Sequence, residues 1–188
     1  METLNTRLAV DLEGSFECFV RTHQSLVYSI ALRTIRHPAE AEDVAQDSFV
    51  RAYRALRTYP PERVESLQLR AWLARIVLNL ALNRQRGRRT AVLDRSGKLY
   101  EQAVDSLTEP SPGPEASWEL RESTVRWRSL LDRLPPHERQ AVELRHVHGL
   151  SYLELAEALG RPVNTVKSHV HRGVAKLRAA YEAEELVA

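Results

Sequence analysis

The sequence has a single cysteine, Cys18, among its 188 residues. One thiol cannot build an intrachain disulfide framework or a cysteine-based zinc site, and this usage is typical of a reducing compartment, so we expect a cytoplasmic protein. Long apolar stretches are also missing, because no run approaches the roughly 18 residues of a membrane-spanning helix. The opening residues METLNTRLAVDLEG lack the pattern of a signal peptide. The sequence therefore predicts neither a membrane span nor export.

An excess of charge of either sign is missing as well. The chain has 27 basic and 25 acidic residues and a formal net charge of +2, so its overall charge does not predict binding to nucleic acid. The distribution of charge is uneven, however. Residues 66–98 carry eight basic side chains and one acidic one, whereas residues 99–122 carry six acidic side chains and one arginine. A basic segment is thus followed directly by an acidic one.

Strand-like alternation of apolar and polar residues is not found, and the periodicity is helical instead. Apolar residues recur at spacings of three and four over about residues 16–36, 39–56 and 69–86, which predicts three helices with one buried stripe each. Pro38 fits the first turn of the second helix. The residues expected inside are Phe19, Leu26, Ile30, Ala31, Val44, Ala45, Phe49, Ala52, Leu56, Trp72, Leu73, Ile76, Val77 and Leu80.

Proline clusters between the two halves of the chain. Pro110, Pro112 and Pro114 fall within five residues, in a stretch where helical periodicity has faded, which predicts a flexible acidic linker. Helical periodicity resumes at about Trp118. The sequence thus predicts an all-α protein with two small helical domains, residues 1–89 and 118–188, joined by a linker at residues 90–117.

A helix-turn-helix is predicted in the C-terminal half. Ser151 and Glu154 have the spacing of a capping box, and Gly160 fits the tight turn between two helices. The second helix would direct outward the polar and basic side chains that base edges and phosphates require. These residues are Asn164, Thr165, Lys167, Ser168, His171 and Arg172. The alternative is a charged helix face that contacts only solvent. Gly173 fits either a close helix contact or a merely weakened helix.

Four segments resemble, in order, the signatures of one protein family. They are AEDVAQDSFVRAYRAL, AWLARIVLNLALNRQRGRR, LLDRLPPHERQAVELRHVHGLSYLELAEALG and NTVKSHVHRGVAKLR. Together they are similar to the extracytoplasmic-function, or group 4, sigma factors of bacterial RNA polymerase over about residues 16–181. The resemblance implies no enzyme and no cofactor or metal. It implies a protein that directs core RNA polymerase to minus-35 and minus-10 promoter elements and helps to open the duplex, for a stress or envelope-response regulon.

The resemblance also implies surfaces for the polymerase. The family segment that docks on the β′ clamp helices matches Asp43, Gln46, Asp47 and Arg51, and the C-terminal domain is expected on the β flap. Many members of the family are held inactive by an anti-sigma factor, which is therefore a possible further partner.

Contacts with the minus-10 element are implied for the third helix. Asn79 and Asn83 match positions that hold a flipped base; they lie one helical turn apart, and their amides can both donate to and accept from a base edge. The loop at residues 58–68 matches the family loop that closes over this base. The DNA backbone just upstream is expected to contact Arg84, Arg86, Arg88 and Arg89.

Two other readings and one departure from the family pattern bear on function. A free-standing regulator can carry the same helix-turn-helix, but it usually needs a dimerising or ligand-sensing domain, which the first 90 residues do not indicate. A metalloenzyme needs converging ligands, whereas His146 and His148 are two residues apart and lack a third ligand at metal spacing. The family commonly has arginine at His169, so the resemblance implies weaker phosphate anchoring there.

Overall fold

The computed structural model describes residues 3–96 and 126–185 of the chain. All regular structure in these two ranges is helical, as the all-α prediction requires, and no strand occurs within them. The chain divides into two compact units, with the helices up to Ser96 in the first and most residues from 126 onward in the second. None of the helices in the described ranges is both long and apolar enough to cross a membrane.

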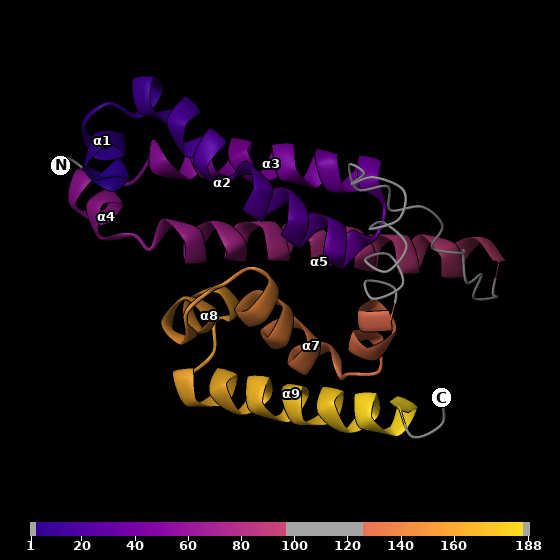
Figure 1. The fold of residues 1–188 in the computed structure, drawn as a ribbon. Coiled ribbons are helices and arrows are strands. Elements are labelled where there is room, and N and C mark those ends of the chain that lie inside the picture. Colours follow the sequence, from indigo (N-terminus) through magenta and orange to yellow (C-terminus); the bar gives the residue numbers. More distant parts are fainter. Residues whose placement is uncertain (1–2, 97–125, 186–188) are drawn as a thin grey trace, which may run out of the picture. The chain divides into compact units, whose positions relative to one another are not determined.

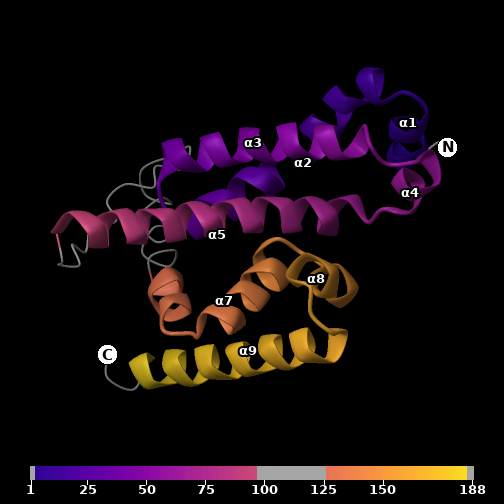
Figure 2. The ribbon, with the colours of Figure 1, turned by 180° about the vertical axis from the view of Figure 1, so that it is seen from behind.

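Three long helices form the body of the first unit: α2 (Leu12–Ile35), α3 (Pro38–Leu56) and α5 (Leu69–Ser96). They pack against one another pairwise and lie side by side (Figures 1 and 2). Two short helices, α1 (Leu4–Val10) and α4 (Pro61–Ser66), lie together at the end of the bundle where α5 begins. The core between the long helices includes Phe19, Val27, Ile30, Val44, Ala52, Leu73 and Val77.

Local signals explain where the long helices begin and end. The Asp11 carboxylate accepts a 2.9 Å hydrogen bond from the Gly14 amide and so caps α2. Arg36 ends α2 in the left-handed conformation with a φ of 60°, and Pro38 then opens α3 as predicted. The chain can therefore reverse direction within two residues.

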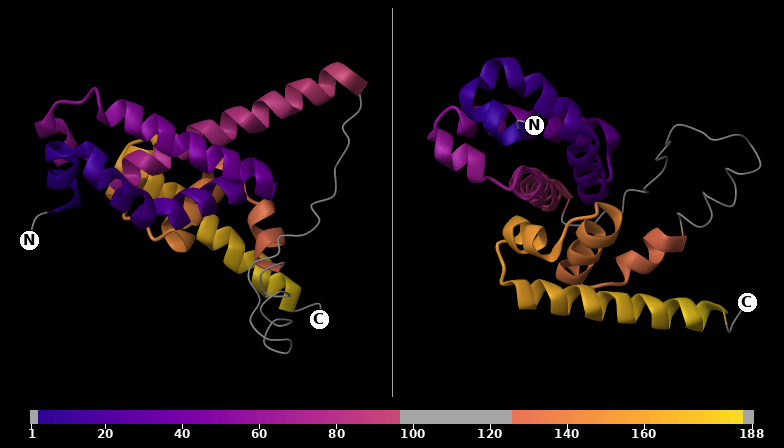
Figure 3. Two further views of the ribbon diagram at one scale, coloured as in Figure 1. Left: turned by 90° about the horizontal axis from the view of Figure 1, so that it is seen from above. Right: turned by 60° about the vertical axis from the view of Figure 1, so that its left-hand side comes forward.

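Several helix bounds differ from the predicted ones. Residues 4–10 and 61–66 are helical although no helix was predicted there, because helices this short lack the repeated apolar stripe on which the prediction depended. The third predicted helix does not end near Arg86, since α5 continues to Ser96 and extends past the ends of α2 and α3 (Figure 3). Residues 90–96 of the predicted linker are thus helical, and its residues 97–117 lie outside the described residues.

Most residues predicted inside the first unit are buried, but five are only half-buried: Leu26, Phe49, Trp72, Ile76 and Leu80. They flank the buried stripes instead of forming them. In α5 the buried stripe also uses small or unpredicted positions, namely Ala74, Leu78 and Ala81. Packing against the two neighbouring helices decides which residues of α5 lie at the centre of the buried stripe. Apolar periodicity alone gave the position of this stripe only to within one residue.

The second unit is built around its last helix, α9 (Val163–Glu185). Residues 126–132 are helical and are followed by α7 (Pro136–Val142), a π-helical turn η1 (Glu143–Val147) and α8 (Tyr152–Leu159). Helix α7 packs along α9 (Figures 1 and 3). Gly149, with a φ of 66°, ends the preceding turn. The core of this unit includes Leu130, Leu134, Val142, Leu144, Leu155, Val166, Val170 and Leu177.

The predicted helix-turn-helix is present in α8 and α9. The Ser151 amide donates to the Glu154 carboxylate at 2.8 Å, and the Glu154 amide donates to the Ser151 hydroxyl at 3.2 Å, so the capping box is complete. Gly160 turns the chain with a φ of 60°, a conformation that strongly favours glycine. Local sequence thus sets the angle at which α9 leaves α8.

Candidate nucleic-acid and protein interfaces

The outer face of α9 carries all six residues predicted to contact DNA. Five are exposed and Thr165 is half-buried. No acidic residue occurs between Val163 and Tyr181. The exposed residues are Asn164, Lys167, Ser168, His171 and Arg172. The face therefore combines neutral donors and acceptors with cations and has no acidic side chain of its own, the mixture that a DNA groove accepts.

Local contacts order part of this α9 face. The Ser168 hydroxyl donates to the Asn164 carbonyl at 2.9 Å, and Arg172 Nε donates to the Ser168 carbonyl at 3.3 Å. Lys167 Nζ lies 5.7 Å from the ring centre of Tyr152 in α8, and the Arg145 guanidinium carbon lies 5.0 Å from the same ring centre. The electron-rich ring attracts both cations, so Tyr152 links the first helix of the motif to the second.

A charged cluster lies behind the α9 face, where α7 packs on α9. The Glu138 side chain is buried, and its carboxylate accepts a 2.8 Å hydrogen bond from Lys176 Nζ. Its other oxygen lies 3.9 Å from Arg172 Nε. The hydrogen bond from Lys176 holds the pKa of Glu138 below its ordinary value, although burial acts in the opposite direction. This carboxylate therefore fastens α7 to two cations of α9.

His169 points into the second unit and not toward its surface. Its side chain is buried, and its ring centre lies 4.6 Å from that of His137. Burial lowers the pKa of His169, and the nearby His137, Arg172 and Arg161 lower it further. The contact with α7 therefore covers the side of α9 that carries His169, and this side chain is not part of the exposed face of α9.

Gly173 lets α7 and α9 approach closely. A Cβ atom at this position would lie 2.6 Å from Val142 Cγ2 and 3.5 Å from the Glu138 carbonyl oxygen. Of the two roles that the sequence left open for Gly173, the close helix contact is the one observed.

The four residues predicted to dock on the polymerase form an exposed face of α3. Asp43, Gln46, Asp47 and Arg51 are all exposed. The opposite face of the same helix is buried through Val44, Ser48 and Ala52. The amphipathic pattern of α3 therefore leaves this charged face outside the bundle.

Four of the six residues predicted for the minus-10 element are exposed along α5: Asn79, Asn83, Arg84 and Arg86. Arg88 and Arg89 belong to the same helix, but their side chains lie outside the described residues. Arg84 also reaches α3, since its guanidinium lies 3.8 Å from the Glu40 carboxylate and 3.7 Å from that of Asp43. The predicted DNA-binding helix and the predicted docking helix are thus joined by an ion pair that sequence spacing did not reveal.

The loop between α3 and α5 is ordered by aromatic and hydrogen-bond contacts. The Arg63 guanidinium carbon lies 3.8 Å from the ring centre of Tyr59, and that ring centre lies 6.1 Å from the ring centre of Trp72 in α5. From α1, the Asn5 side-chain amide donates to the backbone carbonyls of Val64, Glu65 and Leu67. The sequence offered no signal for these Asn5 contacts, because they join residues far apart in the chain.

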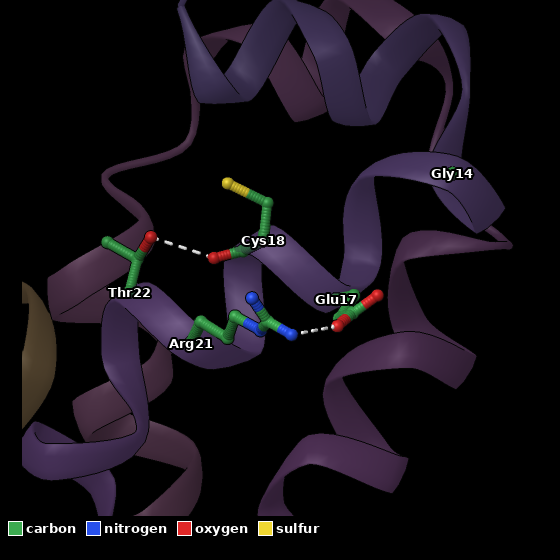
Figure 4. A pocket seen from close by; sticks show the side chains of 5 residues that line it. All are labelled: Gly14, Glu17, Cys18, Arg21 and Thr22. Atoms are coloured by element: carbon green, nitrogen blue, oxygen red, sulfur yellow. Dashed lines mark hydrogen bonds and ion pairs between the residues drawn. The ribbon is translucent and has the colours of Figure 1, made fainter.

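Neither surface depressions nor metal ligands indicate a catalytic site in the described part of the chain. One depression is lined by Gly14, Glu17, Cys18, Arg21 and Thr22, all from α2 (Figure 4). Glu17 and Arg21 pair with each other at 2.6 Å, and the Thr22 hydroxyl donates to the Cys18 carbonyl at 2.7 Å. Across residues 3–96 and 126–185, no three His, Cys, Asp or Glu side chains are grouped so as to hold a metal ion.

Comparison with known proteins identifies both units. Residues 19–90 match the family model for sigma-70 region 2, and residues 124–177 match the model for sigma-70 region 4. The chain is 34% identical over 168 residues to the ECF RNA polymerase sigma factor SigE of Mycolicibacterium smegmatis, covering 87% of this chain and 60% of that relative. It is 34% identical over 173 residues to the RNA polymerase sigma-E factor of Streptomyces coelicolor, covering 92% and 86%.

A solved structure agrees with the sequence relatives. The structure of CnrH in complex with the cytosolic domain of CnrY superposes with a TM-score of 0.68 at 27% identity, and covers 96% of both chains. The two matched regions, the helix-turn-helix and the relatives together show that the chain belongs to the extracytoplasmic-function sigma factors of the sigma-70 family. It is a promoter-directing factor of RNA polymerase and not an enzyme, and the free-standing regulator is not favoured.

Proposed function

We propose that this sigma factor contacts a promoter at two places, with α9 on the minus-35 duplex and α5 on the minus-10 element, and that it helps to open the duplex. One observation carries the proposal: the exposed face of α9, free of acidic residues, follows a complete capping box and a tight turn. Asn164 and Ser168 offer donors and acceptors for base edges, whereas Lys167 and Arg172 offer cations for phosphates or guanine.

The minus-10 element is assigned to α5. Asn79 and Asn83 are proposed to hold a flipped base by its Watson–Crick edge, which their exposure one turn apart on α5 supports. Arg84, Arg86, Arg88 and Arg89 follow along the same helix. We assign them to the DNA backbone, where they add affinity that is independent of sequence and sensitive to salt.

Binding to core polymerase is assigned to α3 and to the second unit. The exposed face of Asp43, Gln46, Asp47 and Arg51 is proposed to dock on the β′ clamp helices, and the second unit on the β flap. The proposed domains are residues 1–89 and 118–188 with a linker at residues 90–117, into which α5 extends.

Cellular context completes the proposal. We place the protein in the cytoplasm, where the polymerase works, and assign it a stress or envelope-response regulon. CnrH, a relative, has been solved with the cytosolic domain of CnrY bound. Since CnrH has a protein partner and many members of the family are held inactive by an anti-sigma factor, we propose that an anti-sigma factor binds this chain and controls its access to polymerase.

A run-off transcription assay tests the proposed function. Purified core polymerase is expected to start at specific sites on genomic fragments only when this protein is added. Asp47→Arg, in the proposed docking face, should abolish this initiation by placing a cation where the polymerase meets a carboxylate. Glu17→Arg is the matched control, because it makes the same charge reversal on α2, outside every proposed interface.

The outcome separates two kinds of protein. Failure to obtain specific initiation on any genomic fragment would overturn the sigma assignment. Tight, sequence-specific DNA binding without polymerase would instead indicate a free-standing regulator.

A further inference from the structure

Helix α4 forms the middle of the loop between α3 and α5, and it is too short to hold its own shape. It has six residues, begins at Pro61 and lacks a side-chain cap at its N-terminus. Its first backbone hydrogen bonds run from the Arg63 and Val64 amides to the Pro60 carbonyl. Isolated helices of this length are unstable in water, so contacts with other elements must keep α4 in place.

Asn5 supplies such a contact at the C-terminal end of α4. Its side-chain Nδ2 lies 3.1 Å from the Val64 carbonyl oxygen, 3.2 Å from that of Glu65 and 2.7 Å from that of Leu67. The last carbonyls of a helix lack partners within the helix, and an amide group has two protons to donate. A side chain from α1 thus completes the C-terminal end of a helix that lies about sixty residues away in the sequence.

Apolar packing fixes the direction from which Asn5 reaches α4. Leu8, three residues further along α1, is 2% exposed, and Val64 of α4 is 3% exposed. Residues three apart share a helix face, so the face of α1 that buries Leu8 also presents Asn5 to α4. The cap on α1 formed by the Thr3 side chain, which accepts from the Thr6 amide at 3.3 Å, holds this short helix in register.

The opposite end of the loop is fastened to α5. Arg63 of α4 stacks on Tyr59, and Tyr59 lies beside Trp72 in α5. Any displacement of α4 therefore moves Arg63 and Tyr59 relative to the helix that carries Asn79 and Asn83. The position of this loop over α5 depends on both attachments.

We infer that Asn5 is a positioning residue for minus-10 recognition, which acts by holding the loop at residues 58–68 against α1. This inference depends on the proposed function, in which the loop closes over the flipped base. Asn5 touches no DNA in this arrangement. It limits the conformations of the loop, and so increases the difference in binding free energy between the preferred base and the other three.

The test measures base preference, which a general loss of stability does not change. Holoenzyme is assembled from core polymerase and the full-length protein, and initiation is measured on four promoters that differ only at the flipped minus-10 base. Asn5→Ala and Asn5→Asp are both expected to lower the ratio of best to worst base by about two- to tenfold, the range that one or two ordinary hydrogen bonds provide. Asp has nearly the shape of Asn but no N–H to donate.

Two controls separate positioning from folding. Ile30→Val removes one methyl group from the core of α2 and leaves the Asn5 contacts intact, so it should lower the melting temperature without changing the base-preference ratio. Hydrogen exchange of the wild-type protein and of Asn5→Ala should differ mainly at residues 60–68, whereas affinity for an isolated minus-35 duplex should stay the same.

The possible failures are distinguishable. If the wild-type protein starts no specific transcription, the proposed function is wrong. If it starts specific transcription and the Asn5 variants keep the wild-type ratio, the proposed function stands and the inference about Asn5 is overturned. If the wild-type protein shows no preference at the flipped base, the assignment of that base to Asn79 and Asn83 fails together with the inference about Asn5. Unchanged hydrogen exchange at residues 60–68 would also overturn it.

Discussion

Two glycines within helices of this protein have opposite surroundings. A Cβ atom at Gly173 would meet Val142 at 2.6 Å, whereas a Cβ atom at Gly87 would have no neighbour within 4 Å. Val142 is β-branched and stiff in a helix, so it cannot turn aside cheaply. Gly173 is therefore required by packing, and Gly87 is not.

Alanine substitutions at these two glycines are expected to change the free energy of unfolding differently. Gly173→Ala should lower the free energy of unfolding by about 1–3 kcal/mol, as overpacking does in a tight interface. Gly87→Ala should leave it unchanged or raise it by up to about 1 kcal/mol, because alanine favours the helix. Urea denaturation followed by circular dichroism measures both. Equal effects of the two substitutions would mean that α7 moves away from α9 at little cost.

The buried imidazole of His169 makes stability depend on pH. Burial lowers its folded pKa below the ordinary value of 6.5, whereas the unfolded chain keeps that value. Below pH 6.5 the unfolded state therefore binds more protons, and the folded state loses stability as the pH falls. Glu138, whose folded pKa is also lowered, adds a loss in the same direction only near and below its ordinary value of 4.5.

We predict that His169→Gln flattens this pH dependence. The urea midpoint of the wild-type protein should fall between about pH 7.5 and about pH 5.5, and that of the variant should fall less. His23 in the first unit also has a lowered pKa, chiefly through burial, so part of the slope should remain in the variant. An identical slope in both proteins would show that His169 binds protons equally in the folded and unfolded states, so that folding does not lower its pKa.

At the scale of single helices, α5 and α9 are proposed to act on different DNA. Asn79→Ala combined with Asn83→Ala should reduce opening of the duplex, because the protein then lacks the amide donors and acceptors that hold the flipped base. Affinity for an isolated minus-35 duplex should stay unchanged. Permanganate footprinting of the holoenzyme measures opening, and fluorescence anisotropy measures duplex binding. Arg172→Ala is the reciprocal control: it should weaken minus-35 binding by about 1–3 kcal/mol if the guanidinium reads a base. An equal loss of both activities in either variant would refute the division between α5 and α9.

The elements that could be predicted from the sequence are those with local signals. The long amphipathic helices follow from apolar spacing, and the capping box and Gly160 place α8 and α9. Helices α1 and α4 were missed because Asn5 stabilises one against the other across the chain. Likewise, the ion pair from Arg84 to Asp43 and the inward orientation of His169 depend on neighbouring helices, which spacing along one helix does not identify.

Across the whole molecule, the charges predict that the proposed minus-35 surface on α9 binds a duplex only weakly by itself. The formal net charge is only +2, and the exposed face of α9 offers two cations, Lys167 and Arg172. Few phosphate contacts give weak, salt-sensitive binding to a duplex. A promoter bound at two places within one polymerase complex is held more tightly, because the first contact raises the effective concentration of the second.

Competition between duplexes tests whether binding at two places accounts for promoter affinity. A competitor duplex that carries only the minus-35 element should release holoenzyme from a promoter at about a hundredfold to ten-thousandfold excess, the range expected when linkage supplies much of the affinity. A competitor with both elements should release holoenzyme near equal concentration, and a scrambled duplex sets the background. In a separate salt titration, Lys167→Ala should reduce the salt dependence of duplex binding by the free protein by about one counterion if this side chain contacts phosphate. Competition by the minus-35 duplex near equal concentration would show that α9 holds the promoter alone, and the minus-10 contacts of α5 would then serve opening and not affinity.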